Sequence, residues 1–337
     1  MADMQIMYDK DGSLEPLNGK TVAIMGFGSQ GHAHSQNLRD SGINVIVAEL
    51  EGTDNYKLAQ EAGFEPMTAG DATAKADLIV ITLPDEIQPV VYEKEIAPNL
   101  TAGKTLGFCH GFNIHFKQIV PPEGIDVIMC APKGPGHTVR DCYKEGSGVP
   151  CLIAIEKDHS GTARDLAMAW AIGVGGGRAG IIESTFKDET ETDLFGEQVV
   201  LCGGLTALIK ASSETLIEAG YAPEMAYFEC VHELLLIIRL ITEGGISYMR
   251  YSISNTAEYG DMAVGPKIID ANVKENMKKA LTAIQDGSFA KEWIAECKAG
   301  KPNFNKLYAE DKKHPIEVVG RKLRGMFAWM TAKNPPE

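Results

Sequence analysis

Short, nearly continuous apolar runs alternate with amphipathic helical stretches through the first half of the chain. The runs are TVAIM (21–25), NVIVA (44–48), ADLIVITLP (76–84), KTLGFC (104–109), DVIMCAP (126–132), CLIAIE (151–156) and a last short one, AGIIEST (179–185). Gly-, Pro- or Asp-rich turns follow them. Continuous apolar strands that alternate with helices are typical of a parallel sheet covered on both faces. Residues 1–184 are therefore predicted to form an α/β domain.

The periodicity becomes helical after about Thr185. Apolar residues recur at helical spacing in residues 198–220, 223–243 and 264–286, where strand signals are few. No internal repeat or low-complexity linker marks the change. We expect an all-α domain over residues 185–330 and a tail over residues 331–337.

The amino-acid composition limits the kinds of partner that the protein is expected to bind. The 337 residues include 46 acids and 32 Lys or Arg, a formal net charge of -14, which disfavours nucleic acid and anionic membranes as partners. The longest apolar run, residues 234–238, is too short to cross a bilayer. Seven Cys without a CxxC motif, and an N-terminus without a signal pattern, indicate a cytoplasmic protein with free thiols.

A glycine-rich turn follows the first predicted strand. Its sequence is GFGSQG, comprising Gly26, Phe27, Gly28, Ser29, Gln30 and Gly31. The glycines permit a tight turn and close approach of a pyrophosphate, which the N–H groups of the next helix stabilise. The context of strand, turn and helix predicts a dinucleotide site in a Rossmann-type domain, although a turn that only joins two elements has the same pattern.

The end of the second predicted strand bears on cofactor choice. An acid there usually accepts hydrogen bonds from the adenosine ribose. Glu49, Glu51 and Asp54 lie in this loop, and no Lys or Arg occurs before Lys57. These charges would repel a 2′-phosphate, so NADH is the predicted cofactor and NADPH use is expected to be weaker. Even if these acids only face solvent, the absence of Lys and Arg from the loop disfavours NADPH.

Polar residues follow three further strands. In an open α/β sheet the carboxyl ends of the strands line the ligand crevice. Asp85 and Gln88 follow the run 76–84, His110 follows 104–109, and Lys133 follows 126–132. His110 is a candidate proton carrier and Lys133 a candidate for stabilising an oxyanion, against the plainer alternatives of a structural His and a surface cation.

Two acid pairs in the second half suggest a metal site. Asp193 and Glu197, and Glu229 and Glu233, are each spaced i, i+4, which in an α-helix places both acids on one face. Thr190 or Thr192 is a candidate N-cap for the first helix. Oxygen ligands favour Mg²⁺ or Mn²⁺. Zinc and di-iron motifs are incomplete, and acids that merely face solvent are the alternative.

The chain resembles class I ketol-acid reductoisomerase over nearly its whole length. The resemblance rests on the segments GFGSQGHAHSQNLRDSG, LPDEIQ, HGFNIHF, APKGPGHTVR, FKDETETDLFGEQ, FECVHELLLI, SYMRYSISNTAEYGD and GRKLRGMFAW. Of these, FKDETETDLFGEQ and APKGPGHTVR are long and highly specific. It implies a Rossmann-type N-terminal domain and a knotted α-helical C-terminal domain. It also implies a homodimer in which each active site is shared between subunits, with dodecamers in some members.

The resemblance also implies site residues. Two Mg²⁺ would be held by Asp193, Glu197, Glu229 and Glu233, and Ser254 would bind the substrate carboxylate. His110 matches the position usually assigned to the active site, and Gly136 matches a cofactor contact. Lys133 and Glu233 are candidates for proton traffic. Family members carry Arg and two Ser in the cofactor loop, where this chain has Leu50, Thr53 and Asn55, a departure that supports the NADH prediction.

The implied reaction has two steps. Mg²⁺ assists migration of an alkyl group in 2-acetolactate or 2-aceto-2-hydroxybutyrate, and NAD(P)H then reduces the new ketone to a 2,3-dihydroxy acid. A two-domain hydroxyacid dehydrogenase without an isomerase step is one alternative, and it would not need the four carboxylates. A nucleotide-sensing or scaffold protein is another, and it would bind cofactor without turnover.

Overall fold

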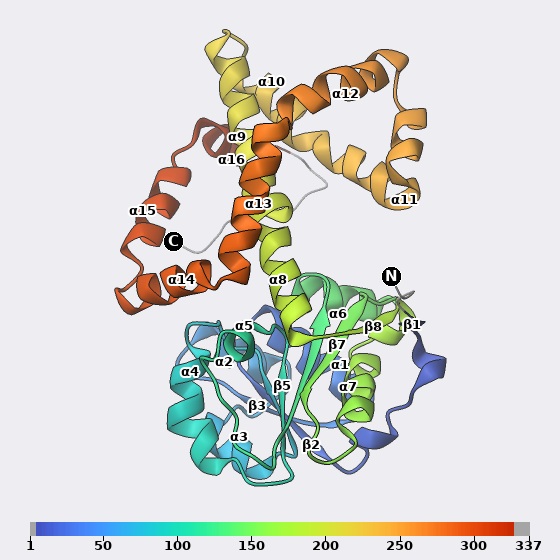
Figure 1. Ribbon diagram of the computed structural model, residues 1–337, viewed down its shortest axis with the longest axis vertical. Coiled ribbons are helices and arrows are strands. Elements are labelled where there is room, and N and C mark those ends of the chain that lie inside the picture. The colour runs from blue at the N-terminus through green and yellow to red at the C-terminus, as the bar shows by residue number, and fades with distance from the viewer. Residues whose placement is uncertain (1–4, 327–337) are drawn as a thin grey trace. The chain divides into compact units, whose positions relative to one another are not determined.

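The computed structural model describes residues 5–326 of the chain. By its internal contacts the chain divides into two compact units, Met1–Thr192 and Asp193–Glu337. The first is an α/β unit and the second is helical (Figure 1). The predictions for residues 327–330 and for the tail lie outside the described residues.

The α/β unit is built on one eight-stranded sheet. The strands are β1 (Ile6–Met7), β2 (Thr21–Met25), β3 (Asn44–Ala48), β4 (Leu78–Ile81), β5 (Thr105–Phe108), β6 (Asp126–Pro132), β7 (Cys151–Lys157) and β8 (Ile181–Ser184). Their order across the sheet is β1-β8-β7-β6-β5-β4-β2-β3. All seven predicted strands are present, and only the two-residue β1 was not predicted.

The sheet is mixed, so the prediction of a wholly parallel sheet was wrong at one side. Strands β2 to β6 run parallel, but β7 is antiparallel to β6, β8 is parallel to β7, and β1 is antiparallel to β8. An apolar run indicates that a strand is buried but not which way it runs, so the reversal could not be predicted from the sequence. The carboxyl ends of β2 to β6 therefore share one edge, where the predicted crevice residues lie.

Helices cover both faces of the sheet (Figure 1). One core contains side chains of α1 (Ser29–Asp40) and α7 (Ala163–Gly173), with Trp170 fully buried. The opposite core contains side chains of α3 (Ala69–Lys75) and of the π-helix Tyr92–Ile96. The remaining short helices are α2 (Asp54–Glu61), α4 (Gln88–Val91), α5 (Phe112–His115), α6 (Gly136–Lys144) and the 3-10 turns Asp9–Asp11, Glu15–Leu17, Ala97–Asn99 and Gly176–Arg178.

The second unit contains no strand among its described residues, as predicted. Its elements are α8 (Phe186–Gly196, which begins in the first unit), the π-helix Glu197–Leu201, α9 (Gly203–Glu218), α10 (Pro223–Tyr227), the π-helix Phe228–His232, α11 (Leu234–Ser252), α12 (Asn255–Ile268), α13 (Ala271–Gln285), α14 (Ser288–Lys298), α15 (Pro302–Asp311) and α16 (Pro315–Arg324). The predicted helix 264–286 is two helices, because Asp270 accepts hydrogen bonds from the N–H groups of Asn272 and Val273 and caps α13.

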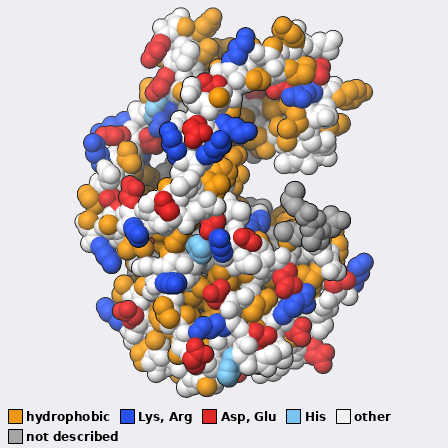
Figure 2. All heavy atoms as spheres, in the orientation of Figure 1, with side chains coloured by type: hydrophobic (Ala, Val, Ile, Leu, Met, Phe, Trp, Pro, Cys, Tyr) orange, Lys and Arg blue, Asp and Glu red, His pale blue; other side chains and the backbone are white. Residues whose placement is uncertain are grey.

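Many large apolar side chains of the helical unit are exposed in the single chain, as hydrophobic side chains on its surface in Figure 2 illustrate. Leu235 is 70% exposed, Tyr251 85% and Tyr259 72%. One helical run, Phe186–Glu218, is long and apolar enough by length and composition to cross a membrane. A single helix of this kind is only weak evidence for a membrane span. In other proteins, large exposed apolar patches often mark interaction sites.

Candidate active site

The glycine turn after β2 has the conformation its sequence predicts. Gly26 has φ +96°, a left-handed conformation that favours glycine. A Cβ on Gly31 would lie 1.9 Å from the Gly26 carbonyl oxygen, so only glycine lets α1 begin this close to the turn. Gly28 has open space around it. The turn thus leaves room at the N-terminus of α1, the position at which a pyrophosphate binds in this fold.

Gly136 and Gln30 join the glycine turn to α6. The Gly136 N–H donates to the Ser29 hydroxyl at 3.0 Å, and a Cβ on Gly136 would lie 1.8 Å from the Ser29 carbonyl oxygen. The Gln30 amide nitrogen donates to the Gly134 carbonyl at 2.9 Å. Two residues predicted to contact the cofactor therefore have a packing role, holding the two helix N-termini together.

Glu49 links the cofactor loop to the glycine turn. One of its carboxylate oxygens accepts from the Phe27 N–H at 2.7 Å, and the other accepts from the Leu50 N–H at 2.9 Å. Thr53 caps α2 by accepting from the Tyr56 N–H. The Leu50 side chain is 72% exposed. The backbone and Glu49 thus give the loop a fixed shape and a negative charge.

The residues after β4 form a buried network. Gln88 is 5% exposed, donates to the Leu83 carbonyl and to Asp85, and accepts from the Asn113 amide at 2.9 Å. Asn113 also donates to the Asp85 carbonyl. The Gln88 side chain, predicted to contact the cofactor, is used to tie α4 to α5 at the crevice edge.

A buried carboxylate brings His110 and Lys133 together. Glu189 is 1% exposed; one oxygen accepts from the Lys133 ammonium at 2.7 Å, and the other lies 3.1 Å from the His110 Nδ1. The Gly111 N–H also donates to Glu189, at 3.2 Å. His110 follows β5 and Lys133 follows β6, so the predicted pair meets on an acid that the sequence reasoning missed.

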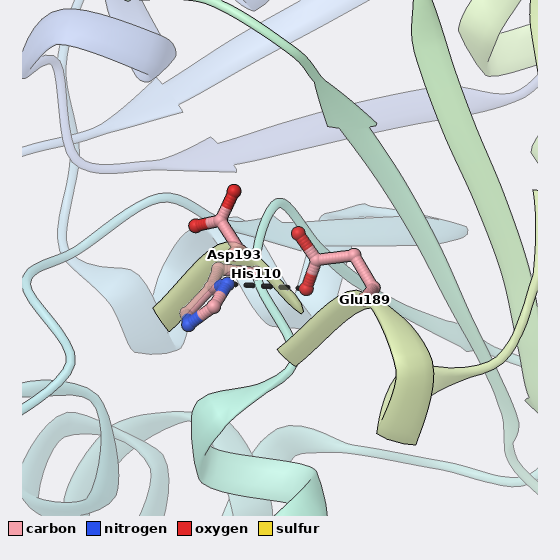
Figure 3. A group of neighbouring side chains, drawn as sticks. All are labelled: His110, Glu189 and Asp193. Atoms are coloured by element: carbon pink, nitrogen blue, oxygen red, sulfur yellow. Dashed lines mark ion pairs between the residues drawn. The ribbon is translucent and has the colours of Figure 1, made fainter. Parts of the chain in front are cut away.

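The charge balance keeps Glu189 ionised. Burial acts to raise the pKa of Glu189, but the His110 imidazole and the Lys133 ammonium outweigh it and hold the pKa below its ordinary value. Asp193 lies one turn further along α8, and the ligand atoms of His110, Glu189 and Asp193 are all within 4.8 Å of one another (Figure 3). The i, i+4 rule used for Asp193 and Glu197 would have found Glu189 if extended one turn back.

Close packing of α8 depends on Gly111. A Cβ there would lie 2.2 Å from the Thr190 hydroxyl and 2.9 Å from the Phe186 carbonyl oxygen. The prediction that Thr190 or Thr192 caps this helix was wrong. The Thr190 hydroxyl donates to the Phe186 carbonyl in mid-helix, and it is Thr185 that accepts from a first-turn N–H. Asp193 thus lies near the end of α8 rather than near its start.

The predicted metal ligands of the helical unit lie beside π-helical turns. The carbonyl of Glu197 accepts from the Cys202 N–H, and the N–H of Glu233 donates to the Phe228 carbonyl, and each of these bonds closes a π turn. Such turns are frequent at functional sites. Glu229 and Glu233 line a groove of about 300 Å³ with apolar walls. In residues 5–326, the single group of close metal-type ligands is His110, Glu189 and Asp193.

Ser254 begins a helix. Its hydroxyl oxygen accepts from the Ala257 N–H at 3.2 Å, which makes Ser254 the N-cap of α12. The side chain is exposed and keeps its own O–H as a donor. A hydroxyl donor at a helix N-terminus is well suited to a carboxylate.

Two family models match the chain along almost its full length. The model described as acetohydroxy acid isomeroreductase, NADPH-binding domain, matches residues 16–180, and the model described as ketol-acid reductoisomerase, C-terminal domain, matches residues 186–329. The chain belongs to the ketol-acid reductoisomerase family. The resemblance inferred from the motifs is confirmed.

Solved structures agree with this assignment. An NADH-preferring ketol-acid reductoisomerase from an uncultured archaeon is 50% identical, with a TM-score of 0.95 over 96% of this chain and 100% of that one. A semialdehyde dehydrogenase NAD-binding protein from Cupriavidus necator (17% identity, TM-score 0.61, 79% and 99% covered) and a pyrroline-5-carboxylate reductase from Coxiella burnetii (16%, 0.56, 82% and 98%) share the fold alone.

Membership decides several of the predictions. The chain is a ketol-acid reductoisomerase, an NAD(P)H oxidoreductase of branched-chain amino acid biosynthesis, from a family of soluble metabolic enzymes. The α/β unit is its NAD(P)H-binding domain and the helical unit its C-terminal domain. The hydroxyacid dehydrogenase and scaffold alternatives were wrong. The knot stays a prediction.

Proposed function

We propose that the chain converts 2-acetolactate and 2-aceto-2-hydroxybutyrate to the corresponding 2,3-dihydroxy acids in the cytoplasm, with two Mg²⁺ per active site and with NADH as the preferred reductant. The observation that carries the catalytic assignment is the buried Glu189 carboxylate, which holds His110 and Lys133 together one helical turn from Asp193.

The donor set fits Mg²⁺. We assign Asp193, Glu197, Glu229 and Glu233 as ligands, since all four offer carboxylate oxygens, and the zinc motif that begins at His232 is incomplete because residue 236 is Leu. Bound Mg²⁺ would polarise the substrate ketone. The π turns beside both pairs and the groove lined by Glu229 and Glu233 support this assignment.

His110, Lys133 and Glu233 are the proposed catalytic side chains. The Lys133 ammonium supplies a donor for an oxygen that gains negative charge, and Glu189 holds that ammonium in place. His110, oriented by the same carboxylate, carries a proton. Glu233 is proposed to accept a proton, and Ser254 donates its hydroxyl to the substrate carboxylate.

The loop after β3 supports NADH. Bound NADH supplies the hydride. We propose that Gly26, Gly28 and Gly31 admit the pyrophosphate and that Glu49 accepts from the ribose. The first cation after the loop in the sequence, Lys57, lies 3.2 Å from Asp54 and is paired with it. The name of the matching family model refers to NADPH and the archaeal relative prefers NADH, so the choice depends on this loop.

We further propose a homodimer whose active sites are shared between subunits, with a dodecamer as a higher assembly. The exposed apolar side chains of α11 and α12 support a second copy of this chain as the partner. Glu229 and Glu233 belong to no group of three or more close metal-type ligands in residues 5–326 of one chain, which agrees with completion by a partner.

The test is oxidation of NADH and of NADPH with 2-acetolactate, with and without Mg²⁺. Turnover that requires Mg²⁺ and has the higher kcat/KM with NADH is expected. Higher kcat/KM with NADPH would overturn the cofactor proposal alone. Turnover without a divalent cation would overturn the metal assignment.

A further inference from the structure

A largely buried chain of side chains connects the dinucleotide helix α1 to the residue that follows β5 and precedes His110. The Trp170 indole N–H donates to the His34 Nδ1 at 3.0 Å, and the His34 Nε2 lies 3.8 Å from the Cys109 Sγ. His34 belongs to α1, Trp170 to α7, and Cys109 directly precedes His110. His34 and Trp170 are both fully buried.

The protonation state of His34 follows from its partners. An indole N–H only donates, so the His34 Nδ1 must accept. Burial lowers the pKa of His34 to about 3, so the ring is neutral at pH 7 and its one proton is on Nε2. That N–H points to the sulfur of Cys109, whose thiol stays protonated because burial raises its pKa.

The same tryptophan also contacts β5 directly. A Cβ on Gly107 would lie 2.8 Å from the Trp170 ring, so the indole packs against the strand where it has no side chain. Two contacts therefore hold the end of β5, one from the indole on Gly107 and one from His34 on Cys109. The next residue is His110, whose imidazole must lie against Glu189.

We propose that His34 is a positioning residue: through Cys109 it fixes His110 relative to the helix that receives the cofactor. The proposal rests on the proposed catalytic role of His110. His34 acts on His110 indirectly, through its contact with Cys109, the residue that directly precedes His110. A misplacement of about 1 Å at a reacting group lowers a rate by up to about 100-fold.

Cys109→Ala tests the proposal, with Cys130→Ala as the matched control. Cys130 is fully buried in the core against which the partly buried Cys109 packs, but Cys130 lies on β6 and contacts Cys151. Because Cys130 is the more deeply buried thiol, Cys130→Ala should lose at least as much stability as Cys109→Ala. Only Cys109→Ala should lower kcat, by about tenfold, with an altered pH profile of kcat and an unchanged Kd for NADH. Cys109→Ser should restore the rate.

A second measurement does not depend on turnover. Nitrogen-15 NMR of labelled histidines in the whole enzyme should show His34 with the proton on Nε2, and Trp170→Phe should change that signal and the His110 signal together. Equal kinetics in the two Cys→Ala variants, or a proton on Nδ1 of His34, would overturn the proposal. Absence of Mg²⁺-dependent turnover in the wild-type enzyme would overturn the proposed function instead. The NMR result would still show whether His34 carries its proton on Nε2.

Discussion

Replacing Glu189 with Gln should cost stability as well as activity. The substitution keeps the size of the side chain but removes the charge that pairs with Lys133 at 2.7 Å. Breaking a buried ion pair costs about 3–5 kcal/mol. Because the Lys133 side chain is 37% exposed, water screens part of this loss, and we expect about 2 kcal/mol. Since Lys133 and His110 lose their shared anchor, kcat should fall by about 100-fold.

The pH dependence of the free energy of unfolding provides a second test of the Glu189 charge. The pKa of Glu189 is lowered in the folded state, so the unfolded chain binds more protons as the pH falls. The stability that the carboxylate contributes is therefore fully present above its unfolded pKa, about 4.3, and is lost as the pH falls through the lower folded pKa. Glu189→Gln should lose less stability than the wild type over this acid range.

Urea unfolding, with a chelator present to remove metal, measures both effects. Glu183→Gln is the control, because Glu183 pairs with Arg164 at a similar distance, 2.8 Å, but with both side chains more than 40% exposed. That exposed pair should be worth less than about 1 kcal/mol. If Glu189→Gln cost no more than Glu183→Gln, and lost stability in acid as steeply as the wild type, Glu189 would not be a charged anchor.

Three further substitutions or treatments have clear expected outcomes. Gly136→Ala should lower the free energy of unfolding by about 1–3 kcal/mol, because the added Cβ would meet the Ser29 carbonyl. Gly28→Ala should leave the free energy of unfolding nearly unchanged and raise only the KM for NADH. Urea unfolding and steady-state kinetics distinguish the two effects. Ser254→Asp should keep the cap on the Ala257 N–H yet raise the KM for 2-acetolactate more than Ser254→Ala does, since it adds a like charge. Chelation of Mg²⁺ should abolish turnover and leave NADH binding, followed by fluorescence, intact.

The strands were predictable because burial and turn chemistry are local. Residues 21–25, 44–48 and 126–132 are strands with the predicted ends. The direction of β7 was not predictable, since a strand buried in the sheet looks the same in either direction. The consequence for the site is small, because every predicted crevice residue follows one of the parallel strands β2 to β6.

Glu189 escaped prediction for a different reason. It lies in the run KDETETD, where the acids look alike in the sequence. What distinguishes Glu189 is tertiary: Gly111 lets α8 approach β5, and Lys133 arrives from β6. In the same way, Gln88 and Gly136 are at the predicted crevice, but the contacts that define their roles lie 25 and 107 residues away in the sequence.

The acid pairs show where a rule of helical spacing stops being sufficient. The i, i+4 argument assumes α-helical geometry. It applies to Asp193 and Glu197, the second of which begins a π turn, but Glu229 and Glu233 span one. Among described residues 193–326, π turns occur at these two places and nowhere else in the unit. A π turn interrupts the regular α-helix and is frequently found at functional sites. Two such turns, one at each predicted ligand pair, are therefore better support for the metal ligands than the spacing that first suggested them.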